Sequence, residues 1–228
     1  MQAPTAMISI HSLLRRLRQE DWTLRSGDGN SIQILLRRIL NLAFAEIKAV
    51  VGIDSYLESE DRRVLEQVIF PYFLGDDTYS NVLFVGCSWC TKAYNKRFEE
   101  KKNYWTIDAW RLKKRYGAKQ HVIDGLQNLG SHFQPGALDL ILCNGVFGYG
   151  LDGKTDVEQA FQACGDCLRE GGVLVIGYAD IAERCPFPLA DCRSLRAAFE
   201  PFVFPPLGKS EYLTDTPWRH KYSFYVKK

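Results

Sequence analysis

Short apolar runs separated by helical segments fill the chain from Asn81 onward, and each run has the length of a strand. The runs cover residues 82–85, 104–107, 121–123, 138–143 and 173–178. Successive positions within them are apolar, which is typical of strands in a parallel sheet that is covered on both faces. A final strand is expected near 222–226, after an apolar stretch at 202–204. The pattern predicts an open α/β sheet.

The first part of the chain, to about residue 78, has a helical period and no run that reads as a strand. Leu13, Leu14 and Leu17 recur at helical spacing, and apolar residues within 32–44 continue the period. A third helix is expected over 59–70, with apolar side chains on one face at Val64, Leu65, Val68 and Ile69. The sequence therefore predicts two parts, a helical cap over 1–78 and an α/β core over 79–228.

Composition and charge narrow the class of protein only slightly. The chain has 228 residues, of which 46% are hydrophobic and 25% charged, as in ordinary globular proteins. Its net charge of +2 gives no reason to expect nucleic acid or an anionic membrane as the main partner. The start of the chain lacks the order of a signal peptide, and the seven cysteines suit reduced thiols. We therefore expect a cytoplasmic protein.

A strand, a tight loop and a helix follow one another from Val82 onward, which is the setting of a nucleotide-type cofactor loop. Gly86 permits the turn after the first strand, and a helix is expected from about Lys92. The second and third glycines of a dinucleotide fingerprint are absent, and Ser88, Trp89 and Cys90 fill the loop instead. These side chains would crowd a pyrophosphate, so a nucleoside cofactor without phosphates fits better.

Two carboxylates follow the next two strands. Asp108 lies 22 positions after Gly86, close to the spacing of about 20 that is typical of a carboxylate binding ribose hydroxyls. Asp124 ends the third strand, where it suits the amino group of adenine. The alternative for both residues is structural, because aspartates at strand ends often cap the following helix.

Two Cys-x-x-Cys pairs, at 87–90 and 164–167, allow two readings based on thiols. A zinc site needs a shorter separation between the pairs, and Cys164 falls at helical spacing with Val157 and Phe161, which indicates a place in the core. We predict no metal. A redox dithiol at Cys87 and Cys90 stays open, because a helix N-terminus lowers the pKa of a thiol.

Five segments in this order and spacing resemble the core motifs of class I S-adenosylmethionine-dependent methyltransferases. They are VLFVGCSWCTKAY, YWTIDAW, HVIDG, LDLILCNGVFGYG and CLREGGVLVIGY, and they span about 81–178. The most specific is the stretch 168–176, which reads as a helix end, a Gly-Gly turn and a buried strand. The resemblance implies a Rossmann-like sheet of seven mostly parallel strands whose last strand is antiparallel, with S-adenosylmethionine as cofactor.

The resemblance also implies roles for individual residues. The backbone of Gly86, Cys87 and Ser88 would meet the methionine part of the cofactor, Asp108 the ribose and Asp124 the adenine, with Asn144 and Gly145 facing the methionine end and the substrate. The glycine loop departs from the usual pattern, since Phe84 replaces an acidic residue and Cys90 replaces the last glycine.

Candidate catalytic residues come from the segments that cover the substrate in similar proteins. His11 in the helical cap and His220 near the end of the chain are candidate bases, needed where the acceptor is an amine or a phenol. Tyr149 would contact the substrate or pack beneath the cap. His121 and His132 are expected to be structural or surface residues.

The function that follows is methyl transfer to a small, aromatic or hydrophobic acceptor, with oxygen slightly favoured over nitrogen because no Asn-Pro-Pro clamp for amides is present. Two alternatives remain open. One is a domain of the same fold that binds a nucleoside without catalysis, and the other is an NAD(P)-dependent oxidoreductase.

Overall fold

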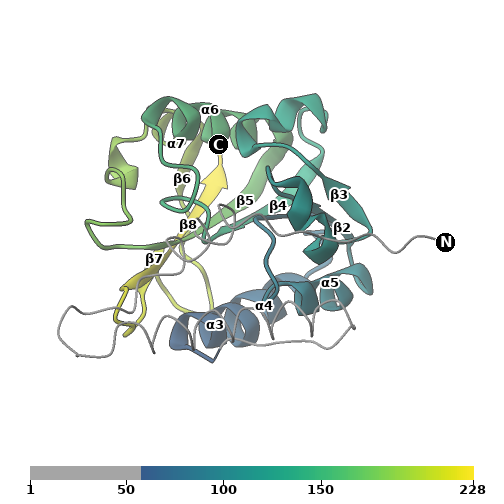
Figure 1. Cartoon of the computed structure of the whole chain (residues 1–228), viewed down its shortest axis with the longest axis horizontal. Coiled ribbons are helices and arrows are strands. Elements are labelled where there is room, and N and C mark those ends of the chain that lie inside the picture. The colour runs from purple at the N-terminus through teal and green to yellow at the C-terminus, as the bar shows by residue number, and fades with distance from the viewer. Residues whose placement is uncertain (1–57) are drawn as a thin grey trace. The chain divides into compact units, whose positions relative to one another are not determined.

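A computed structural model describes residues 58–228, which form one central sheet with helices on both of its faces (Figure 1). Seven strands follow one another across the sheet in the order β3-β2-β1-β4-β5-β8-β6, and a short strand, β7, pairs with β8. The strands are β1 (Asn81–Val85), β2 (Asn103–Ile107), β3 (Gln120–Val122), β4 (Leu138–Asn144), β5 (Leu168–Ala179), β6 (Phe199–Pro201), β7 (Glu211–Leu213) and β8 (His220–Lys227).

The first five strands pair in parallel, and β8 runs antiparallel to β5. The predicted α/β sheet with an antiparallel last strand is confirmed, and β7 is an eighth strand that the sequence analysis did not include. The strand order reverses between β1 and β4. In open sheets of this kind, ligands bind beyond the carboxyl ends of the strands at such a reversal.

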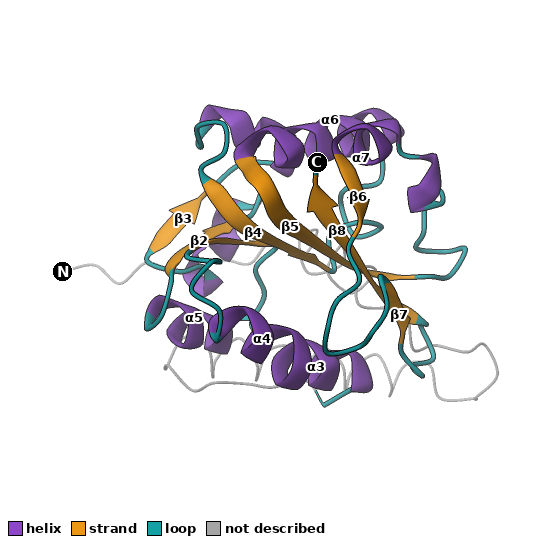
Figure 2. Cartoon of the chain, turned by 180° about the vertical axis from the view of Figure 1, so that it is seen from behind, coloured by secondary structure: helices purple, strands orange, loops and turns teal. Residues whose placement is uncertain are grey.

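Helices cover both faces of the sheet (Figure 2). One face carries α6 (Lys154–Cys167) and α7 (Arg193–Ala198), with short helical turns at η3 (Leu126–Ser131) and η4 (Leu189–Asp191). The other carries α3 (Glu60–Val64), η1 (Leu65–Ile69), α4 (Phe70–Leu74) and α5 (Lys92–Glu99). Another turn, η2 (Arg111–Tyr116), follows β2. Among residues 58–228, no helix combines the length and the apolar character that crossing a bilayer requires.

The side chains of β1 alternate between the two cores, as the strand period requires. Leu83 and Val85 lie in the cluster that includes residues of α6, whereas Val82 and Phe84 lie in the cluster that includes residues of α3 to α5. Both faces of the strand are therefore buried. This explains why its sequence is a continuous apolar run instead of an alternating one.

The third predicted helix is present and longer than expected. It continues through α3, η1 and α4 from Glu60 to Leu74, and Val64, Leu65 and Ile69 are buried as predicted. Pro71 has no N–H to donate, and the wider π-helical turn of η1 ends two residues before it. This end of the predicted cap packs in the same core as β1. The rest of the cap, with its first two predicted helices and His11, lies outside the described residues.

The Gly-Gly pair before the fifth strand was expected to form a turn, but it lies inside β5. Leu168 already pairs with Leu138, and the register then shifts so that Val173 pairs with Leu140. Gly171 takes a φ of +69°, which a glycine adopts without strain. The expected turn is therefore an irregularity within a longer strand.

Replacing Phe70 with alanine is expected to lower the free energy of unfolding by about 3–5 kcal/mol. The ring is fully buried and meets the rings of Tyr94 and Phe98 edge-on, at centroid distances of 4.8 and 4.9 Å. Urea-induced unfolding measures the loss. As a control, Leu112→Ala removes a side chain that is 59% exposed and should change the value by less than about 0.5 kcal/mol. Equal losses in the two variants would contradict this packing.

Candidate functional site

The turn after β1 is built around Gly86, whose φ of +85° lies in the left-handed region. A β-carbon at this position would lie 2.6 Å from Cγ2 of Val146, so a side chain is excluded by space as well as by backbone conformation. The N–H of Gly86 donates to the carbonyl oxygen of Ile107 at 2.9 Å. The turn therefore begins in close contact with the end of β2 and with the segment that follows β4.

Asp108 joins this turn to the loop after β2. The N–H of Cys87 donates to Oδ2 of Asp108 at 2.8 Å, and the N–H of Trp110 donates to Oδ1 at 2.9 Å. The ammonium group of Lys113 lies 3.5 Å from Oδ2. A carboxylate offers about four lone-pair positions, so this buried group keeps capacity for a ligand. The ribose contact of Asp108 stays a prediction, and the structure adds that the same carboxylate organises the cofactor turn.

The remaining N–H groups at the start of this turn are also engaged. The N–H of Ser88 donates to Oγ1 of Thr91 at 2.9 Å, and that hydroxyl donates back to the carbonyl oxygen of Ser88 at 3.0 Å. The N–H groups of Gly86, Cys87 and Ser88 thus all bond within the chain. The carbonyl oxygen of Ser88 also accepts from the N–H of Thr91, so the backbone groups left for a ligand are the carbonyl oxygens of Gly86 and Cys87.

Asp124, after β3, makes its hydrogen bonds within its own turn. It accepts from the N–H of Gly125, the side-chain amide of Asn128 and the ring of His132, each at 2.8 Å. Hydrogen bonds from Asn128 and His132 hold the pKa of Asp124 below its usual value. These contacts are the ones expected if Asp124 stabilises its own turn instead of binding a ligand. The adenine contact stays a prediction, and the neighbouring Ile123, 40% exposed, offers apolar surface at the same strand end.

The thiols of the Cys87–Cys90 pair are buried. Burial, together with the charge of Asp108, raises the pKa of Cys87 to about 12, which is opposite to the lowered pKa of a reactive dithiol. Trp89 packs against Cys87 and Tyr116. No three His, Cys, Asp or Glu side chains within residues 58–228 are arranged to hold a metal ion. The pair therefore serves as packing beneath the turn.

A second group of predicted residues meets at the end of β4. Oδ1 of Asn144 and Nε2 of His220 are 3.1 Å apart, and the N–H of Gly145 donates to the carbonyl oxygen of Gly177 at 2.8 Å. A β-carbon on Gly177 would overlap Oδ1 of Asn144, so the glycine in β5 leaves room for that side chain. The structure thus brings Asn144, Gly145 and His220 together.

His220 is held in one protonation state. It is 5% exposed, and burial lowers the pKa of its ring to about 4, although Asp61 acts in the opposite direction. The ring is therefore neutral at pH 7. Because an amide oxygen only accepts hydrogen bonds, Nε2 carries the proton that faces Asn144 and Nδ1 is the basic nitrogen.

Two charged residues of α3, Asp61 and Arg62, act on His220 and were not among the residues predicted from the sequence. Asp61 is 3% exposed, and the hydroxyl of Tyr222 donates to its backbone carbonyl oxygen at 2.8 Å. Nε of Arg62 lies 3.8 Å from Oδ2 of Asp61, and a terminal nitrogen of Arg62 donates to the hydroxyl of Tyr94 at 3.2 Å. That hydroxyl donates to Glu66 at 2.6 Å. Asp61 and Arg62 are thus fixed by contacts from three parts of the chain.

A signal for Asp61 was present in the sequence. Asp61 precedes Val64 and Leu65 by three and four positions, so it shares their buried helix face. A carboxylate on the apolar face of a helix is unusual and suggests a special role. No comparable signal marks Arg62.

Tyr149 lies in the glycine-rich segment after β4 and is half-buried. The guanidinium of Arg184 lies over its ring, 5.0 Å from the centroid. Burial raises the pKa of Tyr149, and the charges of Arg184, Asp61 and Arg62 also act on it. Tyr149 therefore lies close enough to Asp61 and Arg62 of α3 for their charges to act on its hydroxyl. Its catalytic role and that of His220 stay predictions.

The fold of this chain is that of the class I S-adenosylmethionine-dependent methyltransferases, as its similarity to solved structures shows. One of them is the N-methyltransferase NodS from Bradyrhizobium japonicum WM9, with a TM-score of 0.56 and 16% identity, covering 75% of this chain and 99% of NodS. Another is a TehB-like SAM-dependent methyltransferase from Corynebacterium glutamicum, with a TM-score of 0.54 and 18% identity, covering 86% and 97%.

A third similar structure is magnesium protoporphyrin IX methyltransferase (ChlM) from Synechocystis PCC 6803 with bound SAM. Its TM-score is 0.55 at 13% identity, and the match covers 99% of this chain and 100% of that protein. No protein-family model and no curated protein sequence matches the chain. At these identities the comparisons establish the fold alone.

The stability of the protein is expected to fall between pH 6.5 and 4 because of His220. Its folded-state pKa of about 4 lies below the ordinary 6.5, so its contribution is complete above pH 6.5 and is lost as the pH approaches 4. At pH 5 the loss amounts to about 2 kcal/mol. Urea unfolding at pH 7.5 and pH 5 measures it. His220→Asn should remove this part of the pH dependence, and an unchanged dependence in that variant would refute the assignment.

Proposed function

We propose that this protein is an S-adenosylmethionine-dependent methyltransferase that acts on a small molecule. The observation that carries the proposal is the meeting of three features where the strand order reverses. They are the Gly86 turn after β1, the buried carboxylate of Asp108 after β2, and Asn144 at the end of β4. This arrangement lies in a fold shared with methyltransferases, one of which has SAM bound.

The groups around the turn fit a cofactor that consists of a nucleoside joined to an amino acid. Carbonyl oxygens of the turn suit an ammonium group, and the remaining lone pairs of Asp108 suit ribose hydroxyls. Ile123 and Trp110, each 40% exposed at the ends of neighbouring strands, offer apolar surface for a base. When bound, S-adenosylmethionine supplies an electrophilic methyl group.

The same groups disfavour a dinucleotide. A pyrophosphate binds backbone N–H groups at such a turn, and the N–H groups of Gly86, Cys87 and Ser88 already have partners. This observation argues against the NAD(P)-dependent alternative more directly than crowding by Trp89 does.

The contribution of the chain to methyl transfer is positioning and, for some acceptors, removal of a proton. Asp108 and the turn would hold the cofactor, and the residues around Asn144 would face the acceptor. ChlM is by name a magnesium protoporphyrin IX methyltransferase, which supports a small-molecule acceptor here. Oxygen remains favoured over nitrogen as the acceptor atom.

Isothermal titration calorimetry of the full chain with S-adenosylhomocysteine and with NAD tests the proposal. We expect binding of the first compound and none of the second. A methyl-transfer assay with labelled S-adenosylmethionine and a panel of metabolites follows. Binding without transfer to any acceptor would favour a nucleoside-binding domain, and tighter binding of NAD would overturn the proposal.

Asp108→Asn is expected to weaken the binding of S-adenosylhomocysteine by about 1–3 kcal/mol, because it removes a charge-assisted hydrogen-bond acceptor. The same titration measures the change. Asp156→Asn, an exposed position in the first turn of α6, is the matched control and should leave the affinity unchanged. Equal affinities in the two variants would remove Asp108 from the site.

A further inference from the structure

The buried residues Asp61, Asn144 and His220 and the half-buried Arg62 form a polar cluster that includes the ends of β4 and β5. Asp61 and Asn144 are more than nine-tenths buried. Three atoms of the cluster have no hydrogen-bond partner within residues 58–228, namely Oδ1 of Asp61, Nε of Arg62 and Nδ2 of Asn144. Buried polar groups are nearly always hydrogen-bonded, so three orphans in one cluster point to a ligand.

Contacts with Tyr222 and Gly177 hold the cluster together. The hydroxyl of Tyr222 donates to the backbone of Asp61, and its ring lies 4.8 Å from the ring of His220. His220 in turn meets Asn144. A β-carbon on Gly177 would lie 2.9 Å from Nε2 of His220 and 2.9 Å from the ring of Tyr222, so its absence permits this close approach.

The cluster also borders the cofactor turn. The carbonyl oxygen of Asn144 lies 3.8 Å from the position that a β-carbon on Gly86 would take. Arg62 lies within electrostatic range of Cys90, which is part of the same turn. The backbone of Asn144 thus lies beside the loop that, under the proposed function, would hold the methionine part of the cofactor.

The orphaned atoms select one kind of acceptor. A carboxylate oxygen such as Oδ1 of Asp61 only accepts hydrogen bonds, whereas Nδ2 of Asn144 and Nε of Arg62 only donate. A hydroxyl group satisfies both kinds of partner, because it donates one hydrogen and has two lone pairs, of which one accepts and the other attacks. A neutral amine has a single lone pair, and a carboxylate has no hydrogen to donate and would be repelled by Asp61.

We propose that the acceptor of this enzyme is the hydroxyl group of a small alcohol or phenol, held between Asp61 and Asn144. This inference rests on the proposed function. The hydroxyl oxygen forms the new bond to the methyl carbon of the sulfonium cofactor. The carbon–sulfur bond breaks with its electron pair going to sulfur, and the hydroxyl proton passes to the carboxylate of Asp61. The products are a methyl ether and a neutral thioether.

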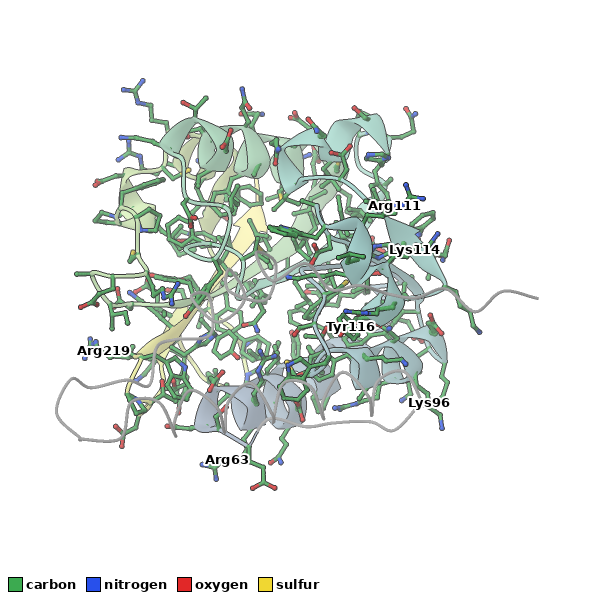
Figure 3. All side chains as sticks on the ribbon, viewed as in Figure 1. Arg63, Lys96, Arg111, Lys114, Tyr116 and Arg219 are labelled. Atoms are coloured by element: carbon green, nitrogen blue, oxygen red, sulfur yellow. The ribbon has the colours of Figure 1, made fainter. Side chains whose placement is uncertain are left out.

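Arg62 is a positioning residue in this arrangement. Its charge lies 3.8 Å from the carboxylate of Asp61, and its bond to Tyr94 fixes the guanidinium. Its neighbour Arg63 has the same side chain but projects away from α3 (Figure 3). The two arginines therefore form a matched pair for mutation.

The test compares the binding of three small aromatic compounds of similar shape to the full chain, which is first saturated with S-adenosylhomocysteine. Phenol, aniline and benzoate are titrated while the side-chain amide signal of Asn144 is followed by NMR, after assignment with Asn144→Asp. Phenol is expected to bind about tenfold or more tighter than the other two and to shift this signal. Phenol binding that is absent or no tighter than that of aniline or benzoate overturns the inference.

Four variants test whether Asp61 and Arg62 cause the preference for phenol. Asp61→Asn keeps the backbone contact with Tyr222 and should weaken phenol binding about tenfold, while the control Asp156→Asn leaves it unchanged. Arg62→Gln should likewise weaken it, and Arg63→Gln should not. Equal effects within either pair overturn the assignment. Calorimetry with S-adenosylhomocysteine distinguishes failure of the proposed function from failure of this inference. A protein that does not bind S-adenosylhomocysteine refutes the proposed function. A protein that binds it but shows no preference for phenol refutes this inference alone.

Discussion

The antiparallel pairing of β8 with β5 is the constraint on which the candidate site depends. A strand that runs against its neighbours begins at the edge where they end, so the first residues of β8 reach the carboxyl edge of the parallel strands. In the observed register Tyr222 pairs with Gly177 and His220 with Ala179. The end of the chain therefore completes a polar cluster that the end of β4 and the helix α3 begin.

Much of this architecture is predictable from the sequence, for a physical reason. Strands of a sheet that is covered on both faces must be apolar on both sides, so they stand out as short runs, and residues directly after them fall at one edge. Asp108 and Asn144 were found in this way, whereas His220 became a candidate because the corresponding segment covers the substrate in similar proteins. Asp61 was not found, because it follows no strand; it shares the apolar helix face of Val64 and Leu65, and its contact with Tyr222 joins positions far apart in the sequence.

Local geometry escaped prediction where side chains fold back on their own loop. Whether Asp124 faces a ligand or its own turn depends on Asn128 and His132, and neither contact follows from spacing alone. The Gly-Gly pair in β5 similarly looks like a turn in the sequence, although pairing of Leu168 with Leu138 extends the strand before it. The spacing of Cys87 and Cys90 likewise does not predict their reactivity, because the pKa of a thiol depends on its burial and on nearby charges.

The contact between Gly86 and Val146 makes these two positions a single steric unit. Because the β-carbon position of residue 86 lies against a methyl group of residue 146, a side chain gained at 86 displaces the segment after β4 that carries Tyr149. Shortening Val146 would relieve the clash but not the cost of the left-handed backbone. A smaller residue at position 146 would therefore compensate only in part for a substitution of Gly86. Homologous chains that keep a bulky residue at 146 should retain glycine at 86.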